Sequence, residues 1–514
     1  MLGGRRFRRE ERMKKKITAL LMAGALCAGM LCGCGGESGQ EESPKESGQG
    51  TNPGENAGGA VDLSNIYSGE LEHNVTIRVL ENDTAIEQGY FQELIDAFNE
   101  KYAEYGIVAV DANMDQYSNL ADDGPYGYGP DVLYQANDVL MKYVEGKHIY
   151  PIPAESLECF PQITENAWNA YQANVNGVSY YMGVPVNVQS SMLYYRKDLL
   201  PEDWETTWDK NGNKVPDMVE SWNDMYRYSQ EIVARNDGHY GYMRSLYDVY
   251  FSSGFLFSYG GYVFGDNNTN ADDLGFSAGN AEIGANVLLQ QAALMNEGCI
   301  DDSITVSAYS RLADGTYFAT MTTPDVYTLF LKELQLVYQA EGMSEEEARA
   351  LAEENLVITE VPKLPASGDL TEEDPELIPL KAMGGVNGYA ISAYTKSPNA
   401  CLAFVEFATG YEMMLRRNQM LGIVPARSDV ADTVGGVSEI MYHNLDAGNI
   451  VVMPSIRAVE QIWTPGQTFF EDLAKDAFRP EAEKKYKTLE DIKNGLAAVD
   501  TQIYDAVHTL AGTN

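Results

Sequence analysis

A group of polar residues interrupts a long apolar stretch in the middle of the chain. The stretch Tyr181–Pro201 is rich in Val, Tyr and Leu, a composition typical of a strand buried on both faces. It nevertheless carries Asn187, Gln189, Ser190 and Ser191. Buried amides and hydroxyls cost free energy unless they have hydrogen-bond partners. We therefore predict that this strand leaves one domain, crosses a ligand-binding cleft lined by these side chains, and enters a second domain.

Two acidic residues mark a second place where a ligand is expected. Val75–Leu80 has the alternation of a strand, and Glu81 and Asp83 follow it. A helical pattern and a second apolar run, Ile107–Val110, come next, so the sequence predicts a β-α-β unit with a parallel sheet. Because ligands of such sheets bind beyond the carboxyl ends of strands, Glu81 and Asp83 are candidate contacts. A solvated acidic loop is the alternative for either residue alone.

A calcium-binding pattern follows the apolar stretch. Oxygen-bearing side chains occupy positions 1, 3, 5, 9 and 12 of an EF-hand-like loop, and a backbone carbonyl occupies position 7. The side chains are those of Asp209, Asn211, Asn213, Asp217 and Glu220, and the carbonyl is that of Val215. The pattern departs from an EF-hand at Lys214, where Gly permits the sharp turn. The sequence thus requires no cofactor and leaves two interpretations of this loop open, a polar Asn-Gly turn that leads into a helix or a structural Ca²⁺ site.

Composition narrows the class of protein. The 514 residues are 44% hydrophobic, which is enough for two domains with cores of their own. The net charge of −40 argues against binding to nucleic acid or to anionic lipid. Cys159, Cys299 and Cys401 are far apart, so we expect buried free thiols, while one long-range disulfide stays open.

The N-terminal segment has the features of an export signal. Basic residues at 14–16 precede the apolar run Ile17–Leu31, which is too short to span a membrane well. Cys34 follows a small residue and resembles the lipidated cysteine of a lipobox; an ordinary signal peptide is the alternative. Residues 35–70 are rich in Gly, Ser, Glu, Pro and Asn, which predicts a flexible tether.

The order of several motifs resembles a known family. The run Leu-Tyr-Tyr-Arg-Lys-Asp-Leu-Leu-Pro ends the apolar stretch, Gly-x-Gly-Pro-Asp occupies 127–131, and Gly-Gly-Tyr-Val-Phe occupies 260–264. This order is similar to that of solute-binding proteins of bacterial ABC transporters, in the maltose-binding class. The resemblance runs from about Val75 to about Val507. It implies a two-lobed α/β fold of the periplasmic-binding-protein type II, in which each lobe is a mixed sheet flanked by helices and crossover hinge segments join the lobes.

The resemblance also implies domain limits and ligand contacts. A signal peptide, 1–33, and a linker with the lipidated cysteine, 34–70, would precede an N-terminal lobe, 71–187 plus 387–443, and a C-terminal lobe, 188–386 plus 444–514. Asp138 stands where the family has a hydroxyl-binding Asp, and Trp463 where it has a ligand-stacking Trp. Gln135 and Asp325 stand where the family often has aromatic residues, which favours hydrogen bonding to a solute other than a maltodextrin. The remaining implied contacts are Asp248, Tyr250 and Gln467.

These features predict an extracytoplasmic lipoprotein that closes on a solute and delivers it to the permease of an ABC importer. We expect a monomer without catalytic activity, lipid-anchored to the outer face of a bacterial cell membrane, with a sugar or oligosaccharide and the permease as partners. A secreted glycan-acting enzyme, a surface glycan-binding adhesin and a binding protein for a non-sugar solute remain alternatives. A glycosidase needs two carboxyl groups at a defined separation, and no spacing in the sequence selects such a pair.

Overall fold

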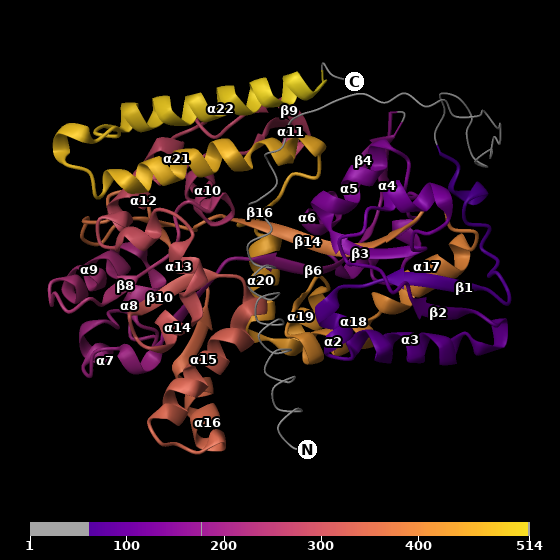
Figure 1. Ribbon diagram of the computed structural model, residues 1–514, viewed down its shortest axis with the longest axis horizontal. Helices are drawn as coiled ribbons and strands as arrows, with labels where there is room; N and C mark the ends of the chain where they lie inside the picture. The colour runs from indigo at the N-terminus through magenta and orange to yellow at the C-terminus, as the bar shows by residue number, and fades with distance from the viewer. Residues whose placement is uncertain (1–60, 176, 512–514) are drawn as a thin grey trace, which may run out of the picture. The chain divides into compact units, whose positions relative to one another are not determined.

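The structure is a computed structural model that describes residues 61–175 and 177–511. The predicted signal segment, Cys34 and the predicted linker up to residue 60 lie outside these residues. In the described part, the chain forms a seven-stranded sheet, a four-stranded sheet and two small two-stranded sheets, together with many helices (Figure 1). The predicted α/β class is therefore confirmed.

The first sheet has the strand order β15-β6-β14-β3-β1-β2, and β16 also pairs with β14. Its strands are β1 (Thr76–Leu80), β2 (Val108–Asp111), β3 (Val132–Ala136), β6 (Val184–Ser190), β14 (Ala382–Ile391), β15 (Val424–Pro425) and β16 (Ile450–Val452). β1 is parallel to β2, and the helix α3 (Tyr90–Lys101) connects them. The helix buries Phe91, Leu94, Ile95 and Phe98, which recur at helical spacing. The predicted β-α-β unit is thus confirmed.

The second sheet has the order β11-β7-β10-β8. Its strands are β7 (Met192–Arg196), β8 (Tyr240–Tyr242), β10 (Tyr317–Thr322) and β11 (Leu356–Thr359). The small sheets pair β4 (Gln172–Val175) with β5 (Val178–Tyr181), and β12 (Leu364–Pro365) with β13 (Leu377–Ile378). A further strand is β9 (Asn270–Leu274).

The apolar stretch in the middle of the chain connects the two main sheets. β6 belongs to the first sheet and β7 to the second, and Ser191 alone separates them. Every residue of these strands except Gln189 is buried. The predicted crossover strand is therefore confirmed. The long strand β14 pairs with β6 and accompanies the crossover (Figure 1). The predicted lobe limits at 187/188 and 386/387 fall inside these two strands.

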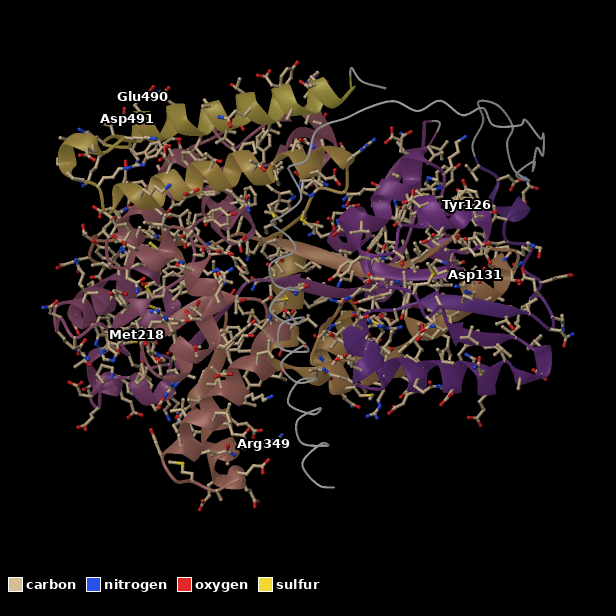
Figure 2. All side chains as sticks on the ribbon, in the orientation of Figure 1. Tyr126, Asp131, Met218, Arg349, Glu490 and Asp491 are labelled. Atoms are coloured by element: carbon tan, nitrogen blue, oxygen red, sulfur yellow. The ribbon has the colours of Figure 1, made fainter. Side chains whose placement is uncertain are left out.

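Helices make up most of the remaining chain. The longer ones, besides α3, are α5 (Asn137–Glu145), α9 (Trp222–Val233), α10 (Val249–Ser258), α12 (Ala281–Ala292), α15 (Tyr327–Ala340), α16 (Glu345–Asn355), α17 (Pro398–Ala408), α18 (Tyr411–Leu421), α20 (Gly436–Asp446), α21 (Trp463–Asp476) and α22 (Leu489–Ala511). The shorter ones are α2 (Asp83–Glu87), α4 (Leu120–Asp123), α6 (Glu165–Asn169), α7 (Trp204–Thr207), α8 (Asp217–Glu220), α11 (Gly265–Asn268), α13 (Ser303–Val306), α14 (Ala308–Ala313) and α19 (Ser428–Val434). At the start of α22, Asp491 accepts hydrogen bonds from the backbone and hydroxyl of Thr488, a local cap (Figure 2).

The three cysteines in the described part of the chain carry free thiols. Cys159, Cys299 and Cys401 are buried and free, as predicted. Burial raises the pKa of each of these thiols, so they stay protonated and unreactive. Within 61–175 and 177–511, none of the helices combines the length and the apolar character needed to cross a membrane.

Candidate ligand-binding site

Three strands of the first sheet end at one edge. β1 is parallel to β3, and both β3 and β6 are antiparallel to β14, so β1, β3 and β6 run in the same direction. Glu81 follows β1, Gln135 is near the end of β3, and Gln189 is near the end of β6. Ligands of α/β sheets bind at such a carboxyl edge. Three predicted contacts therefore belong to a single edge.

Glu81 turns into the protein interior, away from any ligand. Its carboxylate oxygens accept hydrogen bonds from the Arg417 guanidinium at 2.9 and 3.0 Å, and the Tyr389 hydroxyl donates at 2.6 Å. Both Glu81 and Arg417 are 1% exposed. Burial alone would lower the pKa of Arg417, but the Glu81 carboxylate outweighs it and raises that pKa. The predicted ligand contact at Glu81 is therefore corrected to a structural role, because its paired carboxylate leaves no accessible oxygen.

Gln116 connects two other predicted contacts. Its Nε2 donates to Asp83 Oδ2, and its Oε1 accepts from the Asp83 backbone N–H, both at 3.3 Å. Its backbone carbonyl accepts a hydrogen bond from Gln135 Nε2 at 2.8 Å. Asp83 is exposed and Gln135 is half-buried. Gln116 was not predicted, because it lies in a loop where no periodic pattern marks it.

Gln189 of the crossover strand contacts residues from the side of the second sheet. Its Nε2 donates to Asp325 Oδ1 at 2.8 Å, and its backbone carbonyl accepts from the Tyr250 hydroxyl at 3.1 Å. Asp325 is exposed just after β10, and Tyr250 belongs to α10. Burial raises the pKa of Tyr250, and the carboxylates of Asp325 and Asp248 raise it further, so the phenol keeps its proton. Three predicted contacts thus meet at one place.

Asp248 begins α10 and holds a buried arginine. Its Oδ1 accepts from the Tyr250 backbone N–H at 3.0 Å, and its Oδ2 from Arg244 Nη2 at 3.1 Å. The Arg244 guanidinium lies 3.5 Å from the centre of the Phe251 ring. Arg244 is 8% exposed, and its Nε has no hydrogen-bond partner in the described part of the chain. Arg244 was not predicted, and its spacing of four residues from Asp248 was the only signal for it.

Asp138 lies in the first turn of α5. Burial raises the pKa of its carboxyl group, and the Lys142 ammonium acts in the opposite direction. Lys142 forms an ion pair with Glu460 at 2.7 Å, and Glu460 precedes α21, which begins at Trp463. The pair therefore connects the helix that carries Asp138 with the segment that leads to Trp463.

A glycine brings the start of α21 close to the start of α10. A Cβ atom on Gly466 would lie 2.9 Å from Val249 Cγ2, so only glycine permits this approach. Trp463 and Gln467 flank Gly466 on α21, and both are half-buried. Trp463 packs against the core on one side. The two residues are thus held near the helix that Asp248 caps.

Asn137, a neighbour of Asp138, connects three segments. It is completely buried, and its Nδ2 donates to the Met453 carbonyl at 3.0 Å and to Ser455 Oγ at 2.7 Å. Its Oδ1 accepts from the backbone N–H of Val386 in β14 at 3.2 Å. This side chain therefore fastens α5 to β14 and to the segment that follows β16.

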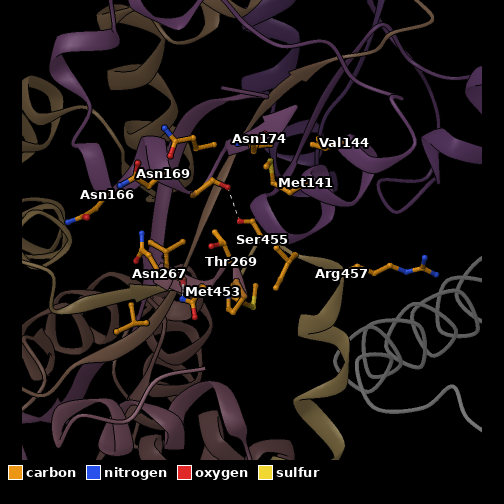
Figure 3. Close-up of a pocket in the computed structure, with 18 of the residues that line it drawn as sticks. Met141, Val144, Asn166, Asn169, Asn174, Asn267, Thr269, Met453, Ser455 and Arg457 are labelled. Atoms are coloured by element: carbon orange, nitrogen blue, oxygen red, sulfur yellow. Dashed lines mark hydrogen bonds between the residues drawn. The ribbon is translucent and has the colours of Figure 1, made fainter. Parts of the chain in front are cut away.

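A separate cavity of about 820 Å³ lies beside β16 and is lined by none of the predicted contacts. Amide side chains, among them Asn166, Asn169 and Asn267, gather around it (Figure 3). Ser455 at its wall donates to the Ala170 carbonyl at 2.8 Å. The predicted contacts and this cavity are thus distinct features of the protein.

The loop 209–220 makes a left-handed turn at the position where the calcium pattern has glycine. Lys214 adopts a φ of +64°, which supplies the left-handed turn that glycine usually makes. Its backbone N–H donates to Asp209 Oδ2 at 3.1 Å, and the amides of Asn211 and Asn213 donate to the Glu220 carboxylate at 3.0 and 2.7 Å. Asp209 Oδ1 is buried without a partner in the described part.

The oxygen atoms of this loop are of the chemical kinds that bind Ca²⁺ in proteins. Among the described residues there is no metal-binding cluster of three or more His, Cys, Asp or Glu side chains. An ion here would therefore depend on amide and carbonyl oxygens as well as carboxylates, which suits Ca²⁺. Asp217 is buried, and both its oxygens accept from the Lys210 backbone N–H at 3.2 Å.

Comparison with known families identifies the class of protein. Residues 93–439 match the family described as bacterial extracellular solute-binding protein. The match covers more than half of the chain, so this protein belongs to that family. Members of the family are extracytoplasmic by that description.

The individual relatives match different shares of this chain. The maltodextrin-binding protein MdxE of Bacillus subtilis is 28% identical over 38% of this chain, a match that spans 43% of that relative. The galactooligosaccharide-binding protein of the same organism is 22% identical over 91% of this chain and 95% of its own length. Among solved structures, the maltose-binding protein MalE of Listeria monocytogenes in complex with maltose has a TM-score of 0.64 at 20% identity, covering 84% of this chain and 98% of that one. The similarity to this structure confirms the predicted two-lobed fold.

Proposed function

We propose that this protein is the solute-binding component of an ABC importer and that it binds a sugar or oligosaccharide. One observation carries the proposal: Gln189 of the crossover strand meets Asp325 and Tyr250, while Gln135 and Asp83 lie at the same sheet edge. A small number of polar groups that converge beside aromatic rings is typical of a sugar-binding site. The names of the relatives, which refer to maltodextrin and galactooligosaccharide, support a carbohydrate ligand.

The mechanism follows from the placement of the contacts. A ligand that touches Gln135 on one side and Asp325 and Trp463 on the other gains contacts when the two sides approach. Such a ligand binds the closed form more tightly and shifts the population toward it. The permease would then recognise the surface of the closed form. In this proposal the protein performs no catalysis, and no residue has a chemical role beyond binding.

A thermal-shift screen tests the proposal. The purified protein is heated with mono- and oligosaccharides, with amino acids, peptides and polyamines as contrast. A ligand at 100 times its Kd stabilises the native state by about 2.7 kcal/mol, which is easily detected. Stabilisation by a sugar is expected. Stabilisation by the contrast solutes alone would discard the sugar and retain the importer role, and turnover of a chromogenic glycoside would overturn the binding function.

We propose that a lipid on Cys34 anchors the protein to the outer face of the membrane. The support is the small residue at 33 before the cysteine and the apolar run before it. Cells that express the protein should incorporate labelled palmitate into it, and Cys34→Ala should abolish the label. A Cys34→Ala protein that still carries the label would contradict the proposal.

We also propose that the loop 209–220 holds a structural Ca²⁺ ion. The left-handed turn at Lys214 supports it, as does Asp209 Oδ1, which has no hydrogen-bond partner among residues 61–175 and 177–511. Millimolar Ca²⁺ should raise the Tm relative to EDTA, and Mg²⁺ at the same concentration should not. Asp209→Asn should reduce the effect of Ca²⁺, whereas the exposed Glu346→Gln in α16 should not. An identical Tm with Ca²⁺ and with EDTA would contradict the proposal.

A further inference from the structure

The cavity beside β16 has the size of a ligand-binding pocket. Its volume is about 820 Å³, and pockets for small molecules in proteins typically measure about 300–1,000 Å³. Its walls come from α5 and α6, from β4 and β5, from α11 and from the segment that follows β16. It shares no lining residue with the crossover site, which is formed by Gln189, Asp325 and Tyr250. An occupant of the cavity would therefore be a separate ligand.

Uncharged polar side chains, most of them amides, line this cavity. The amides are those of Asn166, Asn169, Gln172, Asn174, Asn267 and Asn268. Among the described lining residues, only Lys142, Glu145 and Arg457 are charged. Lys142 pairs with Glu460 at 2.7 Å, Glu145 is exposed, and Arg457 extends away from the amides (Figure 3). A buried ion needs a counter-ion, so this lining favours a neutral ligand.

Two of the amides have hydrogen-bonding groups that the protein does not use. The side chains of Asn169 and Asn267 make no hydrogen bond to any residue within 61–175 and 177–511. Asn268, by contrast, donates to the Val452 carbonyl and accepts from the Phe264 backbone N–H, both at 3.1 Å. Each free amide offers two N–H donors and one carbonyl acceptor. A hydroxyl group also donates and accepts, so these amides suit a polyhydroxyl ligand.

The turn that carries Asn267 has an unusual backbone. Asp266, Asn267 and Asn268 follow one another with φ values of +50°, +56° and +66°. This left-handed conformation is disfavoured for residues other than glycine, and it is concentrated at functional sites, where the surrounding structure maintains it. The hydrogen bond from Asn268 to Val452 fixes the turn to the end of β16. The turn therefore places the free Asn267 amide at the cavity wall in spite of a conformational cost.

Apolar side chains complete the lining, among them Met141 and Val144 of α5 and Ile456 after β16. Such side chains can cover the C–H faces of a sugar ring while the amides bind its hydroxyls. We propose that this cavity is a second binding site, which takes a neutral saccharide independently of the solute at the crossover site. The inference goes beyond the proposed function, which concerns the crossover site alone.

Equilibrium dialysis of the purified protein counts the bound sugar molecules. The probes are radiolabelled glucose, galactose, maltose and lactose, each titrated into the millimolar range. At least one of them should bind with two molecules per protein. Inorganic phosphate is the charged contrast and should not compete with the second molecule, because the lining provides no free cation directed into the cavity.

Two substitutions remove the free amides one at a time. Asn267→Gly keeps the left-handed backbone accessible, and Asn169→Ala shortens the side chain at the end of α6. Each should weaken the second molecule by about 3- to 10-fold, the effect of one hydrogen bond, and leave the first unchanged. Asn236→Gly is the matched control, because Asn236 is exposed, has a φ of +53° and lies outside the cavity lining. Asp325→Ala should weaken only the molecule at the crossover site.

The pattern of losses separates this inference from the proposed function. A single bound molecule that Asp325→Ala weakens and the two cavity variants do not would overturn the second site and leave the proposed function intact. Two molecules that both cavity variants leave unchanged would also overturn it. A single molecule with the opposite pattern would support the cavity and contradict the crossover site. Binding of none of the probes would overturn the second site, and the wider thermal-shift screen would still decide the proposed function.

Discussion

The buried pair of Glu81 and Arg417 gives the sharpest test of the structure. In Glu81→Gln, the Arg417 guanidinium loses its counter-ion while it remains buried over the rings of Tyr134 and Tyr90, at 4.1 and 5.0 Å. Breaking a buried ion pair from one side costs about 3–5 kcal/mol, because the remaining charge is uncompensated. The substitution also replaces one of the two carboxylate oxygens with an NH2 group, which cannot accept the hydrogen bonds that Arg417 and Tyr389 now donate. We therefore expect the free energy of unfolding to fall by about 3–5 kcal/mol.

Urea unfolding followed by circular dichroism measures the loss. The adjacent Arg416 provides the control, because it pairs with Glu93 at 2.8 Å on the exposed surface. Glu93→Gln should therefore give no resolvable change. The double variant Glu81→Gln/Arg417→Met should recover part of the stability, because it removes the unpaired charge.

Two results would refute the structural role of Glu81. The first is a loss of stability below about 1 kcal/mol, the size expected of an exposed pair. The second is a folded Glu81→Gln protein that has lost its sugar affinity at full stability. That outcome would show that Glu81 contributes to ligand binding.

Three further changes test other parts of the site and of the fold. Trp463→Ala should weaken ligand binding by about 1–3 kcal/mol if the ring covers the ligand, and unchanged affinity with a lower Tm would make Trp463 a core residue. Gly466→Ala should destabilise the protein by about 1–3 kcal/mol, since the new Cβ would press on the stiff, buried Val249; a neutral effect in thermal melts would contradict the close approach. Burial opposes the charge on Asp472, but hydrogen bonds from two basic side chains outweigh it and lower its pKa. The contribution of Asp472 to the stability of the folded state should be complete above the unfolded pKa of about 3.9 and should be lost as the pH falls through the lower folded pKa. Asp472→Asn should therefore have a lower Tm than wild type at pH 6, and the two Tm values should converge in strong acid.

Local sequence patterns determined the elements of the fold. The helical spacing of Phe91, Leu94, Ile95 and Phe98 fixed the buried face of α3, and the apolar stretch up to Arg196 marked the crossover. These features depend on neighbours a few residues away, which one sequence contains. The order of motifs along the chain was sufficient to indicate the family, which the comparison then confirmed.

The roles of single polar residues were decided only by tertiary structure. Glu81 and Asp83 look alike in the sequence, yet Glu81 meets Arg417, 336 residues away, while Asp83 stays exposed beside Gln116. The orientation of the Gln135 amide likewise depends on a carbonyl 19 residues earlier. Whether a carboxylate supports the core or faces a ligand depends on which partner the fold brings within hydrogen-bonding distance. Composition and periodicity do not identify that partner, because the packing of segments that are distant in the sequence brings the two residues together.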